Sequence, residues 1–507
     1  MPEYVPGEAF TRSREAFERT VEWLAGPEAA GLEHAAVEER LAAEGRDAQR
    51  LQLQEHLDLR AAREPRRADV TGEDGIARTR AERGHRRPLA SLFGEVTVSR
   101  IAYRAPGAAN VHPADAELNL PPGKHSHGLA KLTVTEAARG SFTQASAAVE
   151  RHTGVVLSTR QVQELTVAGA ADFTGFYRGR ERRPPPPAAP GQLLGLSCDG
   201  KGIVTLPGQL RPDAARRAAA AVPKQDGRLS RGEVRTRKRM AEVGAVFGIT
   251  PAPRAASDII RPPGAGPAPP GPAVTGKQVT ASIADDAAAV VAAVFDEAGR
   301  RDPGHRLTWI ALADGNIHQI ARIQAEAAAR AVTVTIICDF IHVLEYLWKA
   351  AWCFYPEASP DAGPWVRARA AAILRGHALA VAAAIRDTAA ARAARLTPAK
   401  RKAAAATATY LTAKAPYLDY PKALAAGWPI SSGLIEGACR HIVKDRMDIT
   451  GARWGVATAE AVLRIRALCA NGDFEPYWAY HLQRERERNY PGPRPEPGRP
   501  DDYHLAA

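Results

Sequence analysis

Four acidic residues stand where an apolar run gives way to a glycine or to a helix pattern. Asp199 ends the run LLGLSC, Asp314 ends WIALA, Asp339 ends TIIC, and Glu436 follows SSGLI. His342 lies three residues after Asp339. A carboxylate at the end of a buried strand needs a compensating charge, and a divalent metal ion supplies one. All-oxygen ligands of this kind suit Mg²⁺, or Mn²⁺ in its place.

Each acid also has a simpler explanation. Asp-Gly is a strong hairpin signal, so Asp199 could belong to a turn. Asp339 could cap the helix that is expected after it, with His342 one turn along on the same face. Glu436 could be a first-turn residue that the helix dipole stabilises.

Two residues compete for the role of second metal ligand. Asp314 repeats the arrangement of Asp199, with an apolar run before it and a glycine after it. Asp339 also follows an apolar run, and its carboxylate could orient His342 toward a phosphate. We favour Asp314 and keep Asp339 as its rival.

The pattern around these acids predicts an α/β domain. Strands are expected at residues 192–198, 202–206, 241–249, 307–313 and 332–338, and helices at 285–298 and 317–329. Three strands, a helix, and then alternating strand and helix resemble the RNase H-like fold, in which a parallel pair joins a hairpin-built mixed sheet. In that fold strand-end carboxylates and a later helical glutamate hold two metals for phosphoryl transfer on nucleic acid.

Composition divides the chain into five parts. These are a helical N-terminal region at 1–88, a short β-hairpin and helix-turn-helix DNA-binding region at 89–177, a catalytic core at 191–342 and 429–482, an all-helical insertion at 343–428, and a disordered tail at 483–507. A basic loop is expected at residues 78–87, and a disordered proline- and glycine-rich segment at 262–272.

A glycine turn between two helical patterns precedes the core. Gly154 breaks the first helix, and Ser158 can cap the second. A helix, a turn and a capped helix with polar residues near its start are typical of the helix-turn-helix. Arg160, Gln161 and Gln163 would then contact DNA. The alternative is a helical hairpin that only packs.

Basic residues also follow Glu436 along the same predicted helix. The candidates for DNA contact here are Arg440, Lys444, Arg446, Arg453 and Trp454. Acid among bases beside a tryptophan indicates a site that grips phosphates and stacks a base, although a solvated charged helix would look the same. Trp348 and Trp352, in the insertion, are interpreted mainly as core residues.

Bulk properties set the class of partner. Lys and Arg number 68 against 56 Asp and Glu, which gives a net charge of +12 and favours a polyanionic partner. None of the five cysteines forms a C-x-x-C pair, so no zinc ribbon is predicted. No apolar run reaches the roughly 18 residues of a membrane span. We expect a cytoplasmic, nucleoid-associated protein with no membrane partner.

The ordered motifs resemble those of bacterial insertion-sequence transposases of the Kra type, within the DDE group that shares a C/D-x-x-H motif. The resemblance covers roughly residues 90–480 and is strongest around Glu436. It implies that Asp199, Asp314 and Glu436 bind the metals, with Asp339 and His342 as an auxiliary catalytic motif. One departure is the lack of a cysteine cluster for an accessory zinc domain.

The function that this resemblance implies is DNA transposition. The protein would cleave and join double-stranded DNA at the terminal inverted repeats of an insertion sequence and at its target, with Mg²⁺ or Mn²⁺. Bringing two ends together implies a homodimer or a higher oligomer. Two alternatives stay open: a non-catalytic, transposase-derived DNA-binding repressor, and an RNase H-like nuclease that cuts without joining.

Overall fold

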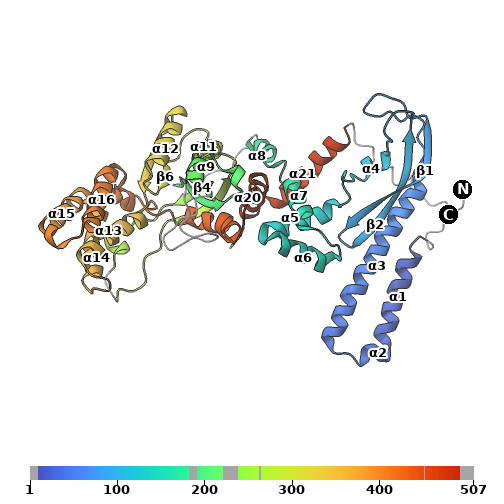
Figure 1. Cartoon of the computed structure of the whole chain (residues 1–507), viewed down its shortest axis with the longest axis horizontal. Coiled ribbons are helices and arrows are strands. Elements are labelled where there is room, and N and C mark those ends of the chain that lie inside the picture. Colours follow the sequence, from blue (N-terminus) through green and yellow to red (C-terminus); the bar gives the residue numbers. More distant parts are fainter. Residues whose placement is uncertain (1–8, 182–190, 221–237, 262–263, 450, 492–507) are drawn as a thin grey trace. The chain divides into compact units, whose positions relative to one another are not determined.

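The chain forms two compact units, which are drawn in Figure 1. The computed structural model describes residues 9–181, 191–220, 238–261, 264–449 and 451–491. Unit 1 combines Met1–Thr174 with Phe474–Ala507, and unit 2 is Gly175–Asp473. Across the described ranges, no helix combines the length and the apolar character that crossing a membrane requires.

Unit 1 consists of a helical hairpin, a two-stranded antiparallel ribbon and a group of packed helices. Its elements are α1 (Thr11–Ala25), α2 (Pro27–Ala30), α3 (His34–Arg63), β1 (Arg80–Ser91), β2 (Gly94–Arg104), α4 (Pro113–Glu117), α5 (His127–Arg139), α6 (Phe142–Thr153), α7 (Thr159–Gly169) and α21 (Phe474–Asn489). Helix α8 (Phe173–Glu181) spans the boundary between the units. The predicted loop at 78–87 is wrong, because most of it belongs to β1, paired with β2.

The C-terminal helix α21 belongs to unit 1. The Tyr477 hydroxyl donates to the carbonyl of Gly169 at 2.7 Å, and Nδ1 of buried His481 lies 2.7 Å from a carboxylate oxygen of Asp172. The predicted disordered tail therefore starts too early, since α21 continues to Asn489. Residues 492–507 of that predicted tail lie outside the described residues.

Helices α5, α6 and α7 share a hydrophobic core. The buried residues of this core are Ala90, Leu129, Ala137, Ala145, Val149, Val155, Leu157 and Val162. Helix α6 ends at Gly154, whose φ of 71° lies in the left-handed region that glycine adopts without strain. Ser158 then starts α7 with a capping box in which its side chain accepts from the Gln161 N–H. The expected helix, turn and capped helix are therefore present.

Unit 2 is built on a mixed five-stranded sheet in the order β5-β4-β3-β6-β7. Its strands are β3 (Leu193–Val204), β4 (Lys238–Thr250), β5 (Ala273–Ser282), β6 (Trp309–Ala313) and β7 (Val334–Cys338). Strands β3, β4 and β5 pair antiparallel, whereas β6 pairs parallel with both β3 and β7. The predicted α/β class is confirmed.

Two details of the predicted sheet are wrong. The segments expected as separate strands at 192–198 and 202–206 belong largely to the single strand β3, so Asp199 and Gly200 form no turn. Strand β5 was not expected at all. Its first half is exposed at the edge of the sheet, so it lacks the alternating apolar signal. Residues 264–272 of the predicted disordered segment are described in the structure, without helix or strand before β5.

Unit 2 also contains twelve α-helices in the described residues, of which α11, α12, α18 and α20 pack on the sheet. The twelve are α9 (Pro212–Ala220), α10 (Ala256–Ile259), α11 (Ala287–Arg301), α12 (Ile317–Ala329), α13 (Phe340–Phe354), α14 (Ala362–Leu374), α15 (Ala378–Ala391), α16 (Pro398–Lys414), α17 (Tyr420–Ala425), α18 (Gly433–Ala438), α19 (Asp445–Met447) and α20 (Val456–Asn471). Short 3₁₀ turns occur at Pro207–Gln209, Ala393–Arg395 and Ala415–Tyr417, and a π-helical turn, Cys439–Lys444, joins α18 to α19. Helices α13 to α16 gather as one helical group (Figure 1).

Candidate metal centre

The three aspartates lie in one row from the central strand β3 to the edge strand β7. Asp199 is within β3, whereas Asp314 and Asp339 directly follow β6 and β7. Ser197 on β3 pairs in register with Leu312 on β6, which sets Asp199 level with Asp314, two residues further along each strand. Ala313 pairs with Cys338 on β7, which sets Asp314 level with Asp339 one residue further on. Neighbouring strands lie about 4.8 Å apart, so the row brings the three carboxylates into one small region.

Asp199 lies within β3, not at its end. Burial raises the pKa of its carboxyl, and the negative charge of Asp314 adds to that rise. The Gly200 N–H, which donates to the carboxylate at 2.7 Å, and the nearby charge of His342 act in the opposite direction. A carboxylate that its surroundings make costly to ionise gains more than a solvated one when a cation arrives.

Asp314 is held by the turn that it starts. Its Oδ1 accepts from the Asn316 N–H at 2.7 Å, and Asn316 in turn caps α12. The Tyr410 hydroxyl of the insertion lies 3.5 Å from the Asp314 carbonyl oxygen. Gly315, at a φ of 90°, makes this approach possible, because a Cβ there would lie 2.8 Å from that hydroxyl. The insertion thus lies directly over Asp314.

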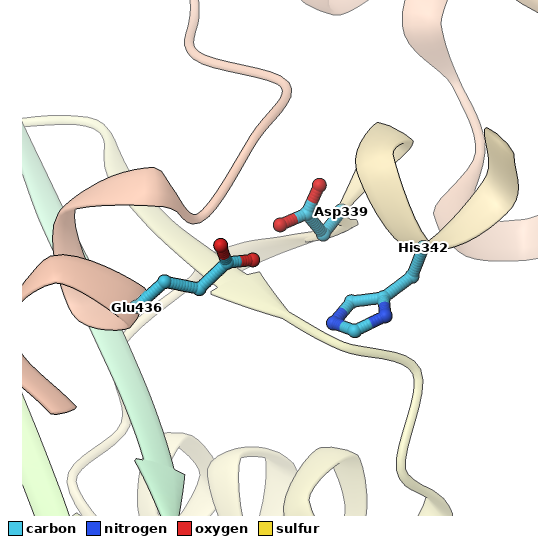
Figure 2. A group of neighbouring side chains, drawn as sticks. All are labelled: Asp339, His342 and Glu436. Atoms are coloured by element: carbon cyan, nitrogen blue, oxygen red, sulfur yellow. The ribbon is translucent and has the colours of Figure 1, made fainter. Parts of the chain in front are cut away.

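Asp339, His342 and Glu436 form the group of side chains in the described residues whose ligand atoms could hold one metal ion. A carboxylate oxygen of each acid and a ring nitrogen of His342 lie within 4.8 Å of one another. Figure 2 shows the two carboxylates facing each other and the imidazole of His342 lying close to both. Asp339 is fully buried, whereas Glu436 is exposed and His342 is half-buried.

Asp339 makes the structural contacts that its position in sequence predicts, and further ones. It caps α13 through its Oδ1, which accepts from the Ile341 N–H at 2.6 Å. Its Oδ2 accepts from the backbone N–H of Ser432 at 2.8 Å and from the Ser432 hydroxyl. The capping alternative for Asp339 is therefore realised, and the same carboxylate also reaches a residue 93 positions along the chain.

Glu436 reaches this region because the chain before α18 is fixed at several points. The guanidinium of Arg254 donates to the Trp428 carbonyl at 2.7 Å, and the Phe340 N–H donates to the Ile430 carbonyl at 2.8 Å. Both contacts link segments that flank the sheet to the residues that lead into α18. The helix that carries Glu436 is thus held against the strands that carry the aspartates.

The basic candidates after Glu436 divide by exposure. Arg440, Lys444 and Arg453 are exposed. Arg446 is buried, with its guanidinium 4.8 Å above the ring of Trp454, and burial lowers its pKa to about 10. Trp454 is 4 % exposed and its indole N–H donates to the Met447 carbonyl. In this conformation neither Arg446 nor Trp454 presents a surface to DNA.

The polar candidates on α7 also differ in what they can offer. Arg160 is strongly exposed and forms an ion pair with Glu164 at 2.8 Å, one turn along the helix. The Gln161 side chain accepts from the Ser158 N–H at 2.8 Å within the capping box. Gln163 is half-exposed. Arg160 is therefore the side chain most open to a ligand, while Gln161 has a structural role.

The insertion departs from the expectation for its tryptophans. Trp348 and Trp352 are 37 % and 38 % exposed and stack on each other, with ring centroids 5.2 Å apart. Both lie on α13, the helix that begins at Asp339. Their interpretation as core residues is wrong. Tyr346 on the same helix stacks on Tyr410 at 3.9 Å, beside Asp314.

Sequence reasoning missed two residues of this region, Ser432 and Tyr410. Nothing in the local pattern around Tyr410 distinguishes it from the other aromatic residues of the insertion. Ser432 stands in the expected start of the Glu436 helix, but its partner Asp339 lies too far away in the sequence to be inferred. No model of a known protein family matches this chain, and no curated protein was found to be similar to it in sequence.

Proposed function

We propose that this chain is a metal-dependent DNA transposase with an RNase H-like core. The observation that carries the proposal is that Asp199 on β3 lies level with Asp314, which directly follows the neighbouring strand β6, while α18, which carries Glu436, packs against β3. The sheet order, with three antiparallel strands followed by a parallel pair, is the order expected of that fold.

The residues present fit a hard divalent cation. Asp199, Asp314 and Glu436 would hold Mg²⁺ or Mn²⁺, since all three offer carboxylate oxygens. Such ions, when bound, polarise a phosphoryl group and lower the pKa of water. The half-buried setting of Asp199 limits the access of bulk water and strengthens its attraction for a cation.

The side chains around the acids would position the nucleic acid. Arg440, Lys444 and Arg453 are exposed on the segment that carries Glu436, where they can neutralise phosphates of a double-stranded DNA end. In unit 1 the capped helix α7 offers Arg160 to a DNA groove or backbone. The protein's contribution to the reaction is then to place the scissile phosphate, not to form a covalent intermediate.

A cleavage and joining assay tests this proposal. Purified protein is incubated with a DNA fragment that carries the ends flanking its own gene, with and without Mg²⁺, beside the Asp199→Asn variant. Metal-dependent nicks at the ends together with joined products, absent from the variant, are the expected result. Tight binding of the ends without any cut would support a repressor instead, and cuts without joined products would support a nuclease.

A further inference from the structure

We propose that Asp339 is a positioning residue whose carboxylate latches the start of α18, so that Glu436 is held opposite His342. The latch itself is defined by hydrogen bonds and burial. Its consequence for metal binding rests on the function proposed above. The latch gives Asp339 a role different from that of Asp314, the other candidate for the second metal ligand.

The Asp339 carboxylate is committed to three donors. Oδ1 accepts from the Ile341 N–H, and Oδ2 accepts from both the N–H and the hydroxyl of Ser432. The side chain is fully buried, so water cannot replace any of these donors. A carboxylate is needed here because an asparagine would turn one N–H group toward a backbone N–H.

The segment that is held is the first turn of a longer helical run. Helix α18 continues through the π-helical turn Cys439–Lys444 into α19, and its first turn has no side-chain cap of its own. The first backbone N–H groups of a helix have no partner within the helix, so the placement of this turn depends on contacts made by the residue that precedes it. Ser432 immediately precedes it, and the Glu436 N–H donates to the Ser432 carbonyl at 3.2 Å. Fixing Ser432 therefore fixes the turn that carries Glu436.

The same contacts argue against Asp339 as a principal metal ligand. Its two oxygens already accept three hydrogen bonds, and its side chain has no exposed surface. Glu436 is exposed and Asp314 is half-buried, so both can exchange water for a cation. On this view, the Asp339 carboxylate lies within 4.8 Å of the ligand atoms of His342 and Glu436 because it holds the turn that carries Glu436.

Three single variants of the full chain, and the double variant that combines Asp339→Asn with Ser432→Ala, test the latch. Asp339→Asn keeps the shape of the side chain but loses one acceptor, and Ser432→Ala removes only the hydroxyl donor. Asp419→Asn is the matched control, because Asp419 caps the neighbouring helix α17 by accepting from the Lys422 N–H and does not touch α18. Two quantities are measured: amide hydrogen exchange in peptides covering residues 430–440, and Mn²⁺ affinity by electron paramagnetic resonance.

The latch predicts that both changes act through α18. Asp339→Asn should speed exchange at residues 432–438 by about tenfold, since a buried donor loses its acceptor. Ser432→Ala should act in the same direction by a smaller factor, and Asp419→Asn should leave this segment unchanged. Mn²⁺ affinity should weaken several-fold in both latch variants. The double variant should be no weaker than Asp339→Asn alone, because both changes remove the same contact.

Two results would overturn the latch. One is loss of Mn²⁺ binding in Asp339→Asn with unchanged exchange in α18, which would make Asp339 a ligand. The other is normal amide exchange at residues 432–438 in Ser432→Ala. If Asp339→Asn exchanges fast throughout the chain because it is unfolded, the Ser432→Ala result alone decides. A wild-type chain that binds no Mn²⁺ would count against the proposed metal site, and the exchange comparison would still decide the latch.

Discussion

Asp199 and Asp314 carry their carboxyls level with each other on two hydrogen-bonded parallel strands. Burial holds the pKa of Asp199 above its ordinary value, and the charge of Asp314 raises it further. The charge of Asp314 thus makes Asp199 costlier to ionise, and a cation bound near Asp199 would offset that cost.

Replacing Asp199 should separate its effect on the stability of the metal-free protein from its effect on DNA cleavage. When a carboxyl has a higher pKa in the folded protein than in the unfolded chain, the folded protein loses stability as the pH rises from the unfolded-state pKa through the folded-state pKa. The Asp199→Asn variant should therefore unfold at a higher temperature than the wild type at pH 7 without metal, by up to about 3 °C. Cleavage should fall by about 10³-fold or more, with DNA binding unchanged. Scanning calorimetry and gel-based cleavage check the two parts, and a lower melting temperature would contradict the first.

Removal of Glu436 should abolish the stabilisation that a metal gives. A ligand that binds only the folded state stabilises it by about 2.7 kcal/mol at 100 times its Kd, so Mg²⁺ should raise the melting temperature of the wild type. Glu436→Gln should show little of this shift. Glu357→Gln, at an exposed site in the insertion, should keep it and serves as the control. Equal shifts in both variants would remove Glu436 from the ligand set.

The exposed arginine of α7 should contribute to DNA affinity and not to stability. Arg160→Ala should weaken binding of the terminal DNA and reduce the slope of log affinity against log salt by about 1, the effect of one lost phosphate contact. Arg139→Ala on α5 removes a similar exposed arginine that pairs with Glu136, and it should leave the slope unchanged. Fluorescence anisotropy over a range of salt concentrations measures both. Identical slopes in the two variants would leave α7 as a packing helix.

Asp172 should stabilise unit 1 in a pH-dependent way. Burial tends to raise its pKa, but hydrogen bonds from Arg488 and His481 outweigh this and hold the pKa below its usual range. Its contribution is therefore complete above about pH 4 and is lost as the pH falls through the lower, folded value.

The Asp172→Asn variant measures that contribution. At pH 7 it should destabilise unit 1 by about 2 kcal/mol, because it leaves the Arg488 guanidinium without its carboxylate partner. Hydrogen exchange in peptides of α21 reports on this unit. Glu487→Gln, which removes an exposed ion pair on the same helix, should have almost no effect. No change in α21 upon Asp172→Asn would show that the helix is held by apolar contacts alone.

The fold was predictable where the local pattern and the long-range pairing agree. Strands β4 and β6 are apolar runs in the sheet interior and β7 is an apolar run at its edge, and the caps at Ser158 and Asp339 are local side-chain contacts. The Asp199-Gly200 pair predicts a turn, but no turn forms because β3 pairs with β4 along its whole length. The exposed half of β5 has no alternation of apolar and polar residues from which a strand could be predicted.

The acids of the candidate site can be selected from the sequence, but the residues that support them cannot. Asp199, Asp314 and Glu436 stand next to patterns that are visible within ten residues. The bond from Ser432 to Asp339 joins positions 93 residues apart, and the Tyr410 hydroxyl meets the Asp314 carbonyl across 96. Only the folded insertion brings such pairs together, so no local pattern indicates them.

Because helix α21 belongs to unit 1, unit 1 cannot finish folding until the last helix of the chain has been synthesised. The N-terminal unit is completed by residues made after the 299 residues of unit 2, a delay of about 15–60 s at ordinary rates of translation. Until then the surface that Trp478 covers beside Gly169 is open. A chain that stops early, after a nonsense mutation for instance, keeps that surface open permanently.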